Sequence, residues 1–335
     1  APWRLPEVVP VIGGTRVIKP LIGLVLAFLV GVVIIGGIKR IAQVASRIVP
    51  LMCGLYIVGA LAVLIRFAPE IPGALAQIFR YAFSPVAVGG GAMGFVVKYT
   101  VQKGVARGVF SNESGLGSAP MAHAAAKTHE PIREGYVAML GPFIDTIVVC
   151  SMTALVILVT GVWQVRAEDG TVLYGPGGKG VPMTANIDGH HKLVVGTVGV
   201  DPKPLTSESG DVYLVKTGTE LTSTAFEEGL GFTGRVVVGL GIVLFAYSTM
   251  ISWSYYGDRC WEYLFGPKAV MPYRYIFCGF VVVGTVSGLE LVWTMSDNLN
   301  ALMAIPNLLA LLGLAGIVTR EARDYTARMK AEGEF

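Results

Sequence analysis

Long apolar runs separated by short polar connections dominate the pattern along this chain. A helix that crosses a bilayer needs roughly 20 apolar residues. Six segments meet this length, namely residues 17–38, 48–66, 136–161, 234–256, 274–294 and 299–319. The composition agrees, because 53% of the 335 residues are hydrophobic and only 15% are charged, whereas soluble domains are about one quarter charged. The pattern therefore predicts an all-α integral membrane protein.

One further segment, residues 86–126, is apolar in composition but interrupted by many glycines. It predicts a short helix followed by a discontinuous spanning segment, centred on the run "KGVARGVFSNESGLGSAP". A broken helix is tolerated at membrane depth only inside the protein or beside a water-filled cavity. Inserting the charged side chain of Glu113 at that depth would cost about 2.5–3.5 kcal/mol of free energy. Gly115 and Gly117 allow the backbone to unwind and to approach a ligand closely.

The break offers backbone groups of both polarities. Carbonyls at the end of the first half-helix suit Na⁺ or an ammonium, and N–H groups at the start of the second suit a carboxylate. This combination fits a zwitterionic amino acid. A plain turn between two re-entrant helices is the alternative; it would explain the glycines and the proline, but not the polar residues Ser111, Asn112 and Glu113 that precede them.

The distribution of lysine and arginine predicts the orientation. Cations lie in the connections 39–47, 126–135 and 257–273 and in the tail after residue 319, whereas the connection 295–298 contains an aspartate and no cation. The cationic connections share one side only if residues 86–126 cross the membrane once. We expect that side to be the cytoplasm.

The chain divides into four parts by composition. A transmembrane region, residues 1–161, is followed by a polar stretch, residues 162–233, then by a second transmembrane region, residues 234–319, and by a cytoplasmic tail, residues 320–335. Structureless loops as long as the polar stretch are uncommon, so we expect a small β-rich extracytoplasmic insertion. Near its end, "TSTAFEEGLG" has the spacing of a capping box followed by a glycine stop, which predicts a short helix starting at Thr224.

Two other polar spots lie inside apolar spans. In "LFAYSTMISWSYYGD", Thr249 and Trp253 share a helical face, and the hydroxyls of Ser248 and Thr249 are hard ligands for a small cation. Helix packing explains such hydroxyls equally well. Asp145 is an intramembrane charge with two open interpretations. It is expected either to pair with Arg107 or polar helix neighbours, or to line an ion path.

Several classes of function find no support. A net charge of +3 without a basic cluster argues against nucleic acid. The four cysteines have no metal spacing, and the pair His190–His191 lacks further ligands and predicts a solvated loop. The run "GGGAMG" lacks the preceding strand that a phosphate-binding loop requires. We therefore expect no cofactor and no enzyme chemistry.

Five stretches together resemble the alanine or glycine:cation symporter family. They are "GGIKRIAQVASRIVPLMCGLYI", "GVARGVFSNESGLGSAP", "GPFIDTIVVCSMTALVIL", "FAYSTMISWSYYGDRCWEYLFG" and "AIPNLLALLGLAG". The resemblance covers nearly the whole chain except residues 162–233. It departs at Ser114, where the family usually has alanine. It implies a LeuT-like inverted-repeat fold, with residues 17–319 supplying core helices four to ten.

The resemblance also implies roles for individual residues. The implied substrate-binding residues are Phe110, Thr249 and Trp253, and from the break itself we expect Asn112 and Gly115 to join them. Ser248 and Thr249 are implied to lie near a sodium position. Glu113, Arg107 and Asp145 are expected to support the break.

The implied function is symport of alanine or glycine with Na⁺, in preference to H⁺, by alternating access in the plasma (bacterial inner) membrane. The bilayer and the two solutes are the expected partners. The first three core helices have no counterpart and residue 1 is Ala, so we expect function to need further N-terminal helices. The alternatives are a membrane-embedded hydrolase using Ser111 or Ser118 with Glu113 and His123, and a non-transporting paralogue with the same fold.

Overall fold

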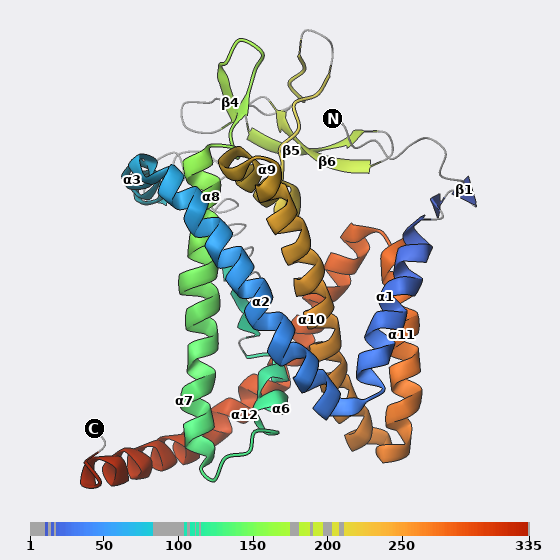
Figure 1. Ribbon diagram of the computed structural model, residues 1–335, viewed down its shortest axis with the longest axis vertical. Helices are drawn as coiled ribbons and strands as arrows, with labels where there is room; N and C mark the ends of the chain where they lie inside the picture. The colour runs from blue at the N-terminus through green and yellow to red at the C-terminus, as the bar shows by residue number, and fades with distance from the viewer. Residues whose placement is uncertain are drawn as a thin grey trace. The chain divides into compact units, whose positions relative to one another are not determined.

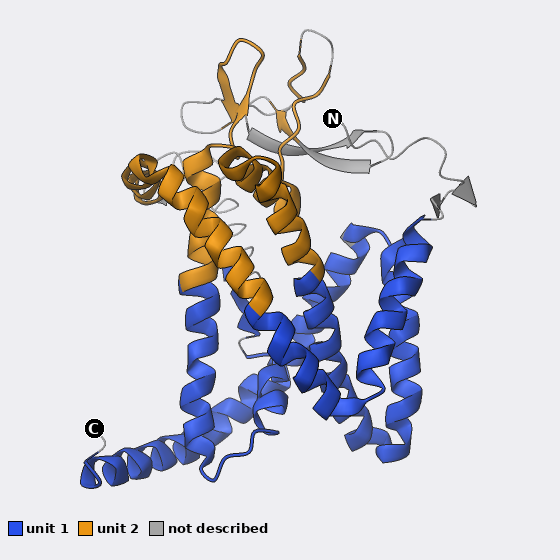
Figure 2. Cartoon of the chain, in the orientation of Figure 1, with its two compact units in different colours: residues 1–50, 94–147, 244–335 blue, residues 51–93, 148–243 orange. Residues whose placement is uncertain are grey.

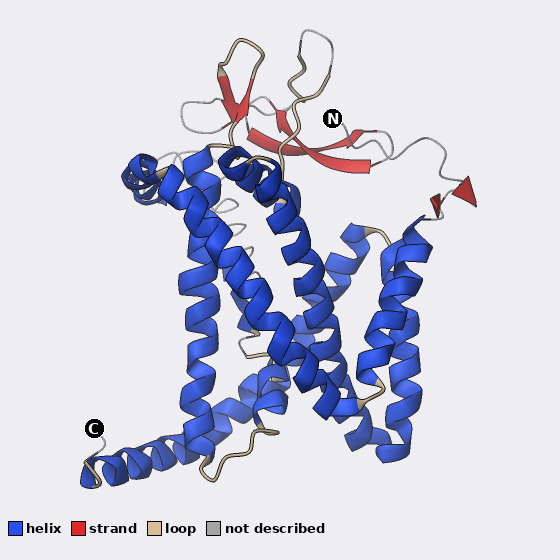
Figure 3. Ribbon diagram, in the orientation of Figure 1, coloured by secondary structure: helices blue, strands red, loops and turns tan. Residues whose placement is uncertain are grey.

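The computed structural model describes a mostly helical chain (Figure 1, Figure 3). The described residues are 11–12, 15–16, 18–82, 104–105, 108–110, 112–113, 115–174, 181–187, 190–196, 203–207 and 211–333. Predictions about the first part of residues 86–126 and about Arg107 and Ser111 fall outside these ranges. The domain boundaries proposed from composition stay a prediction.

Among the described residues, five helical segments are long and apolar enough to cross a membrane. They are α2 (Gly37–Arg66), the segment Pro131–Thr160, α10 (Phe232–Phe265), the segment Pro267–Val286 and Leu291–Ala331 within α12 (Leu289–Ala331). The apolar helix α1 (Ile18–Ile34) is shorter, at 17 residues. Most of each apolar run predicted to span is thus helical, although a turn at Ser287 and Gly288 divides the run 274–294. The five candidate spans are consistent with an all-α integral membrane protein.

The predicted connection at residues 295–298 is wrong. Helix α12 runs unbroken from Leu289, and the chain turns instead at Ser287 and Gly288, whose extended backbones (ψ 151° and 136°) end α11 (Val270–Val286). The polar run at residues 296–298 looks like a loop in a hydropathy profile, but a helix accommodates polar side chains without breaking. The true turn also carries no cation, so the orientation argument is unchanged.

The chain forms two compact units (Figure 2), and each is described by itself. The first unit comprises residues 1–50, 94–147 and 244–335. Here α1 packs along α11, and the close approach leaves no room for a side chain at Gly23, which faces Thr285. Such small residues are typical of helix contacts in membranes. A buried cluster around Ile34 and Ile251 joins α1 and α2 to α10.

In this first unit the connections that carry cations lie at one end (Figure 1). The Arg274 guanidinium donates a hydrogen bond of 3.2 Å to the carbonyl of Ile35 at the α1–α2 corner. Arg328 in the tail of α12 pairs with Glu130, which precedes α7 (Pro131–Pro142), at 2.8 Å. The shared end agrees with the predicted sidedness. Which side faces the cytoplasm stays a prediction.

The second unit comprises residues 51–93 and 148–243. Phe226 of α9 (Gly218–Leu230) is fully buried and packs against Tyr56 with ring centroids 5.3 Å apart. Tyr56 and Thr153 share a hydrogen bond of 2.6 Å. Helix α3 (Ile71–Ala82) was not predicted; the helical spacing of its apolar residues Leu75, Ile78 and Phe79 is the signal that was missed.

The polar stretch contains short strands (Figure 3). Strands β3 (Val165–Arg166) and β4 (Val172–Tyr174) pair antiparallel, as do β5 (Val181–Ile187) and β6 (His190–Gly196). Two further strands, β1 (Val11–Ile12) and β2 (Thr15–Arg16), pair near the N-terminus. The histidine pair thus begins a strand, so the prediction of a loop there is wrong.

The predicted helix after these strands exists, but its predicted start is wrong. Helix α9 begins at Gly218, six residues before Thr224. The Thr224 hydroxyl donates to the carbonyl of Glu220 at 2.9 Å and therefore lies inside the helix. The glycine stop is confirmed, because α9 ends at Gly231 with φ 64°.

Candidate functional site

The predicted interruption of the helix is confirmed in the described part of residues 108–123. Residues 108–110 are helical, and helix α6 (Ser118–His123) follows. Between them Glu113, Gly115 and Gly117 have φ of 50°, 76° and 81°. These left-handed conformations cannot continue a right-handed helix, and for a side-chain-bearing residue such as Glu113 they cost roughly 1–2 kcal/mol.

Side chains of the segment itself stabilise the break. The Asn112 amide donates to the carbonyl of Gly108 at 3.1 Å and so satisfies an acceptor at the end of the first half-helix. The hydroxyl of Ser118, which is fully buried, donates to the Glu113 carboxylate at 2.6 Å. A hydrogen bond to a charged acceptor is stronger than a neutral one. This hydrogen bond agrees with the supporting role expected for Glu113, which stays a prediction.

A π-helical segment, η2 (Phe143–Cys150), faces the break. It interrupts the span between α7 (Pro131–Pro142) and α8 (Ser151–Thr160). Its Thr146 hydroxyl donates to the Asn112 side-chain oxygen at 2.7 Å. The Asn112 amide is therefore held at both of its polar atoms. Irregular π turns inside helices occur frequently at functional sites.

Helix α12 packs directly on the two glycines of the break. A methyl group built on Gly117 would lie 3.1 Å from the Asn307 side chain, and one on Gly115 would lie 3.3 Å from Leu308. The Phe110 ring packs against Trp293 with centroids 5.4 Å apart. Glycine is thus required at these positions by both conformation and space.

A cavity of about 860 Å³ opens beside the break within the first unit. Its polar and charged lining residues are Asn112, Glu113, His123, Thr128, Glu134, Asp145 and Tyr256. Three of these, Asn112, Glu113 and Asp145, are among the residues predicted for the site. The cavity therefore joins the break, α6, α7 and α10.

Glu134 and Tyr256 also line the cavity, although neither was predicted as a site residue. His123 was considered only for the hydrolase; its Nδ1 lies 2.6 Å from a Glu134 carboxylate oxygen. Tyr256 of α10 lines the cavity together with Glu113. The signal for Tyr256 was its place in the polar run of residues 244–258, but which of those side chains face the cavity depends on how α10 is rotated.

The other predicted site residues that the structure describes do not line this cavity. Ser248 is buried and donates to the carbonyl of Phe245 at 3.0 Å, whereas Thr249 is exposed. Trp253 meets Tyr256 edge to face with centroids 5.5 Å apart, which connects α10 to the cavity indirectly. The roles of Phe110, Gly115, Ser248, Thr249 and Trp253 in binding stay predictions.

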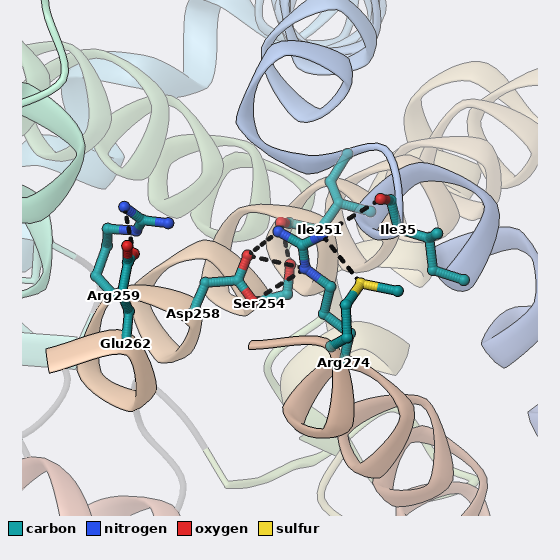
Figure 4. Close-up of polar contacts among 8 residues, drawn as sticks. Ile35, Ile251, Ser254, Asp258, Arg259, Glu262 and Arg274 are labelled. Atoms are coloured by element: carbon teal, nitrogen blue, oxygen red, sulfur yellow. Dashed lines mark hydrogen bonds and ion pairs between the residues drawn. The ribbon is translucent and has the colours of Figure 1, made fainter. Parts of the chain in front are cut away.

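A second buried polar cluster lies at the α10–α11 corner of the same unit (Figure 4). Asp258, only 1% exposed, accepts hydrogen bonds from the Arg274 guanidinium at 2.7, 3.1 and 3.2 Å. The same guanidinium reaches the Ile35 carbonyl. One arginine thus joins α10, α11 and the α1–α2 corner.

The fold and the break define a class before any comparison is made: a multi-pass integral membrane protein with a polar, interrupted helix. The chain belongs to the sodium:alanine symporter family, whose sequence profile matches residues 11–176 and 205–334.

Three relatives illustrate the match. An uncharacterized transporter of Haemophilus influenzae is 38% identical over 81% of this chain and 49% of its own length. The sodium/alanine symporter AgcS of Methanococcus maripaludis is 38% identical over 82% of this chain and 49% of its own. The probable sodium/glutamine symporter GlnT of Bacillus subtilis is 31% identical over 78% of this chain and 44% of its own. The chain spans about half the length of the relatives it matches.

Proposed function

We propose that the protein is a secondary transporter that imports a small neutral amino acid, alanine or glycine, together with Na⁺ across the plasma membrane. Membership of the sodium:alanine symporter family supports this, as does the name of the relative AgcS. The observation that carries the proposal is the interrupted helix at residues 112–117 beside a cavity into which several polar and charged side chains project.

The chemistry of the break suits a zwitterion. Interrupted transmembrane helices place backbone dipoles of opposite sign near one point, where carbonyls favour a cation and N–H groups favour a carboxylate. The side-chain hydrogen bonds of Asn112 and Ser118 stabilise the shape of the break. Binding free energy of Na⁺ and amino acid would then shift the balance between outward-open and inward-open states.

The finer assignments belong to the same proposal. We place the chain in a LeuT-like fold, with Phe110 as an aromatic wall and Thr249 and Trp253 as contacts from α10. Hydroxyl oxygens such as those of Ser248 and Thr249 are hard ligands of the kind that small cations prefer. This favours a sodium position near Ser248 and Thr249.

Two observations weigh against the hydrolase alternative. The Ser118 side chain is fully buried, and its hydroxyl donates a hydrogen bond to the Glu113 carboxylate. A nucleophilic serine must reach its substrate and a base. His123 pairs instead with Glu134 at 2.6 Å. We therefore propose no covalent chemistry and no cofactor apart from the transported ion.

The test is radiolabelled alanine uptake by the full-length protein in proteoliposomes. We expect accumulation driven by an inward Na⁺ gradient, lost when choline replaces Na⁺ and retained with a protonophore. Competition by unlabelled glycine measures the second substrate. Uptake that does not depend on the Na⁺ gradient would overturn the proposed coupling to Na⁺. Absence of any uptake would favour the non-transporting paralogue, and covalent labelling of Ser118 by a fluorophosphonate would favour the hydrolase.

A further inference from the structure

One face of α12 carries polar side chains in an otherwise apolar helix. Within residues 299–319 the only polar side chains are Asn300, Asn307 and Thr319. Asn300 and Asn307 are seven residues apart, and Trp293 is seven residues before Asn300. Seven residues are nearly two full helical turns, so these three side chains share one face.

Both ends of this face contact the break. Trp293 packs on Phe110 with ring centroids 5.4 Å apart. The Cγ and Oδ1 atoms of Asn307 lie 3.1 Å from the position that a methyl group on Gly117 would take. Asn300 lies between these two contacts on the same face. The face of α12 that bears the two amides therefore runs along residues 110–117.

Packing alone does not explain the two amides. In the described part of the chain, the side chain of neither Asn300 nor Asn307 makes a hydrogen bond, and both are half-buried. An amide in an apolar environment without a partner is unfavourable, and polar residues inside membrane helices mark sites of function by default. Pro306, immediately before Asn307, is a further irregularity at this level of α12.

We propose that Asn300 and Asn307 bind the transported amino acid at the break. This rests on the proposed transport function and adds α12 to the site. An asparagine amide offers an acceptor oxygen for an ammonium and two N–H donors for a carboxylate, so it suits both charged groups of a zwitterion. Asn307 contacts the break at Gly117, so an amino acid bound to the backbone of the break would lie beside this contact and within reach of the amides.

The experiment compares alanine uptake and equilibrium alanine binding by full-length wild type, Asn300→Ala and Asn307→Ala. The matched control is Asn298→Ala, the same change on the same helix at an exposed position roughly on the opposite side. Loss of a hydrogen bond to a charged group raises the KM and the Kd for alanine by about 10-fold to 100-fold. We expect this for Asn307→Ala and Asn300→Ala, with a smaller change in the maximal rate and none for Asn298→Ala.

A structural role predicts a different pattern. If the amides only pair with another helix, the variants lose thermal stability but keep the KM of wild type, and the inference is overturned. Asn307→Asp keeps the size of the side chain but loses the donors to a carboxylate, so we expect it to fold and to bind alanine weakly. Wild-type affinity in Asn307→Asp and Asn307→Ala would also overturn it. If wild type itself binds no alanine, the proposed function has failed, which is a distinct outcome.

Discussion

Replacing Gly117 by alanine tests whether the shape of the break is essential. Gly117 has φ 81°, and a side chain in that conformation costs roughly 1–2 kcal/mol. The new methyl group would also lie 3.1 Å from the Asn307 side chain, and overpacking of this kind typically costs about 1–3 kcal/mol. The two effects sum to about 2–5 kcal/mol, which the protein avoids only by changing the break or moving α12.

Two matched alanine substitutions rank the effect. Gly115→Ala has a similar backbone cost at φ 76° but meets only the flexible end of Leu308 at 3.3 Å, so we expect an intermediate loss. Gly313→Ala, inside α12, meets no atom within 4 Å and has ordinary helical backbone. It should be neutral or slightly stabilising, because alanine favours helix over glycine.

The assay is thermal unfolding in detergent together with Na⁺-driven alanine uptake. We expect Gly117→Ala to lower the unfolding temperature most and to reduce uptake at least tenfold, since 1.4 kcal/mol already corresponds to a factor of ten. The reasoning is refuted if Gly117→Ala unfolds and transports like Gly313→Ala.

Three further predictions concern other contacts. Arg274→Met leaves the Asp258 carboxylate buried without its partner, which should lower the free energy of unfolding by about 3–5 kcal/mol; chemical denaturation measures it, and an unchanged value would contradict the buried pair. Thr146→Val removes the bond that orients Asn112, so we expect a higher KM for alanine that Thr146→Ser restores; failure of serine to rescue would speak against this role. A backbone N–H donates to the Asp169 carboxylate and holds its pKa below the ordinary value of 3.8, so the stability that this turn contributes is present above that value and is lost as pH falls through the lower pKa of the folded state. A carboxyl NMR titration of the full protein measures the pKa of Asp169, and a value at or above the ordinary one would contradict this prediction.

Much of the fold could be predicted because hydrophobic runs and glycines act locally. The break was predictable from Glu113, Gly115 and Gly117, since a charge and two flexible residues inside an apolar segment leave few alternatives to an interrupted helix. The end of α11 at Ser287 was not, because a two-residue turn leaves almost no trace in hydropathy. The nearby polar run was more conspicuous and misled the prediction.

The candidate site was predicted only in part, for a physical reason. Asn112 and Asp145 could be singled out one at a time, because each is polar in an apolar setting. The side chains that contact them could not be predicted, because the partner of a side chain depends on how the helices are rotated and packed. Thr146 is 34 residues from Asn112, and Asn307 lies far beyond both in the sequence. Only the packed helices bring them together.

The central claim is that the interrupted helix binds the transported amino acid, and a cryo-EM map of the full-length protein in Na⁺ and saturating alanine tests it most directly. We predict density of the size of alanine against the backbone of residues 112–117, with the helix still broken there. A continuous helix through residues 108–118, or alanine bound elsewhere while the break contacts only protein, would contradict the account.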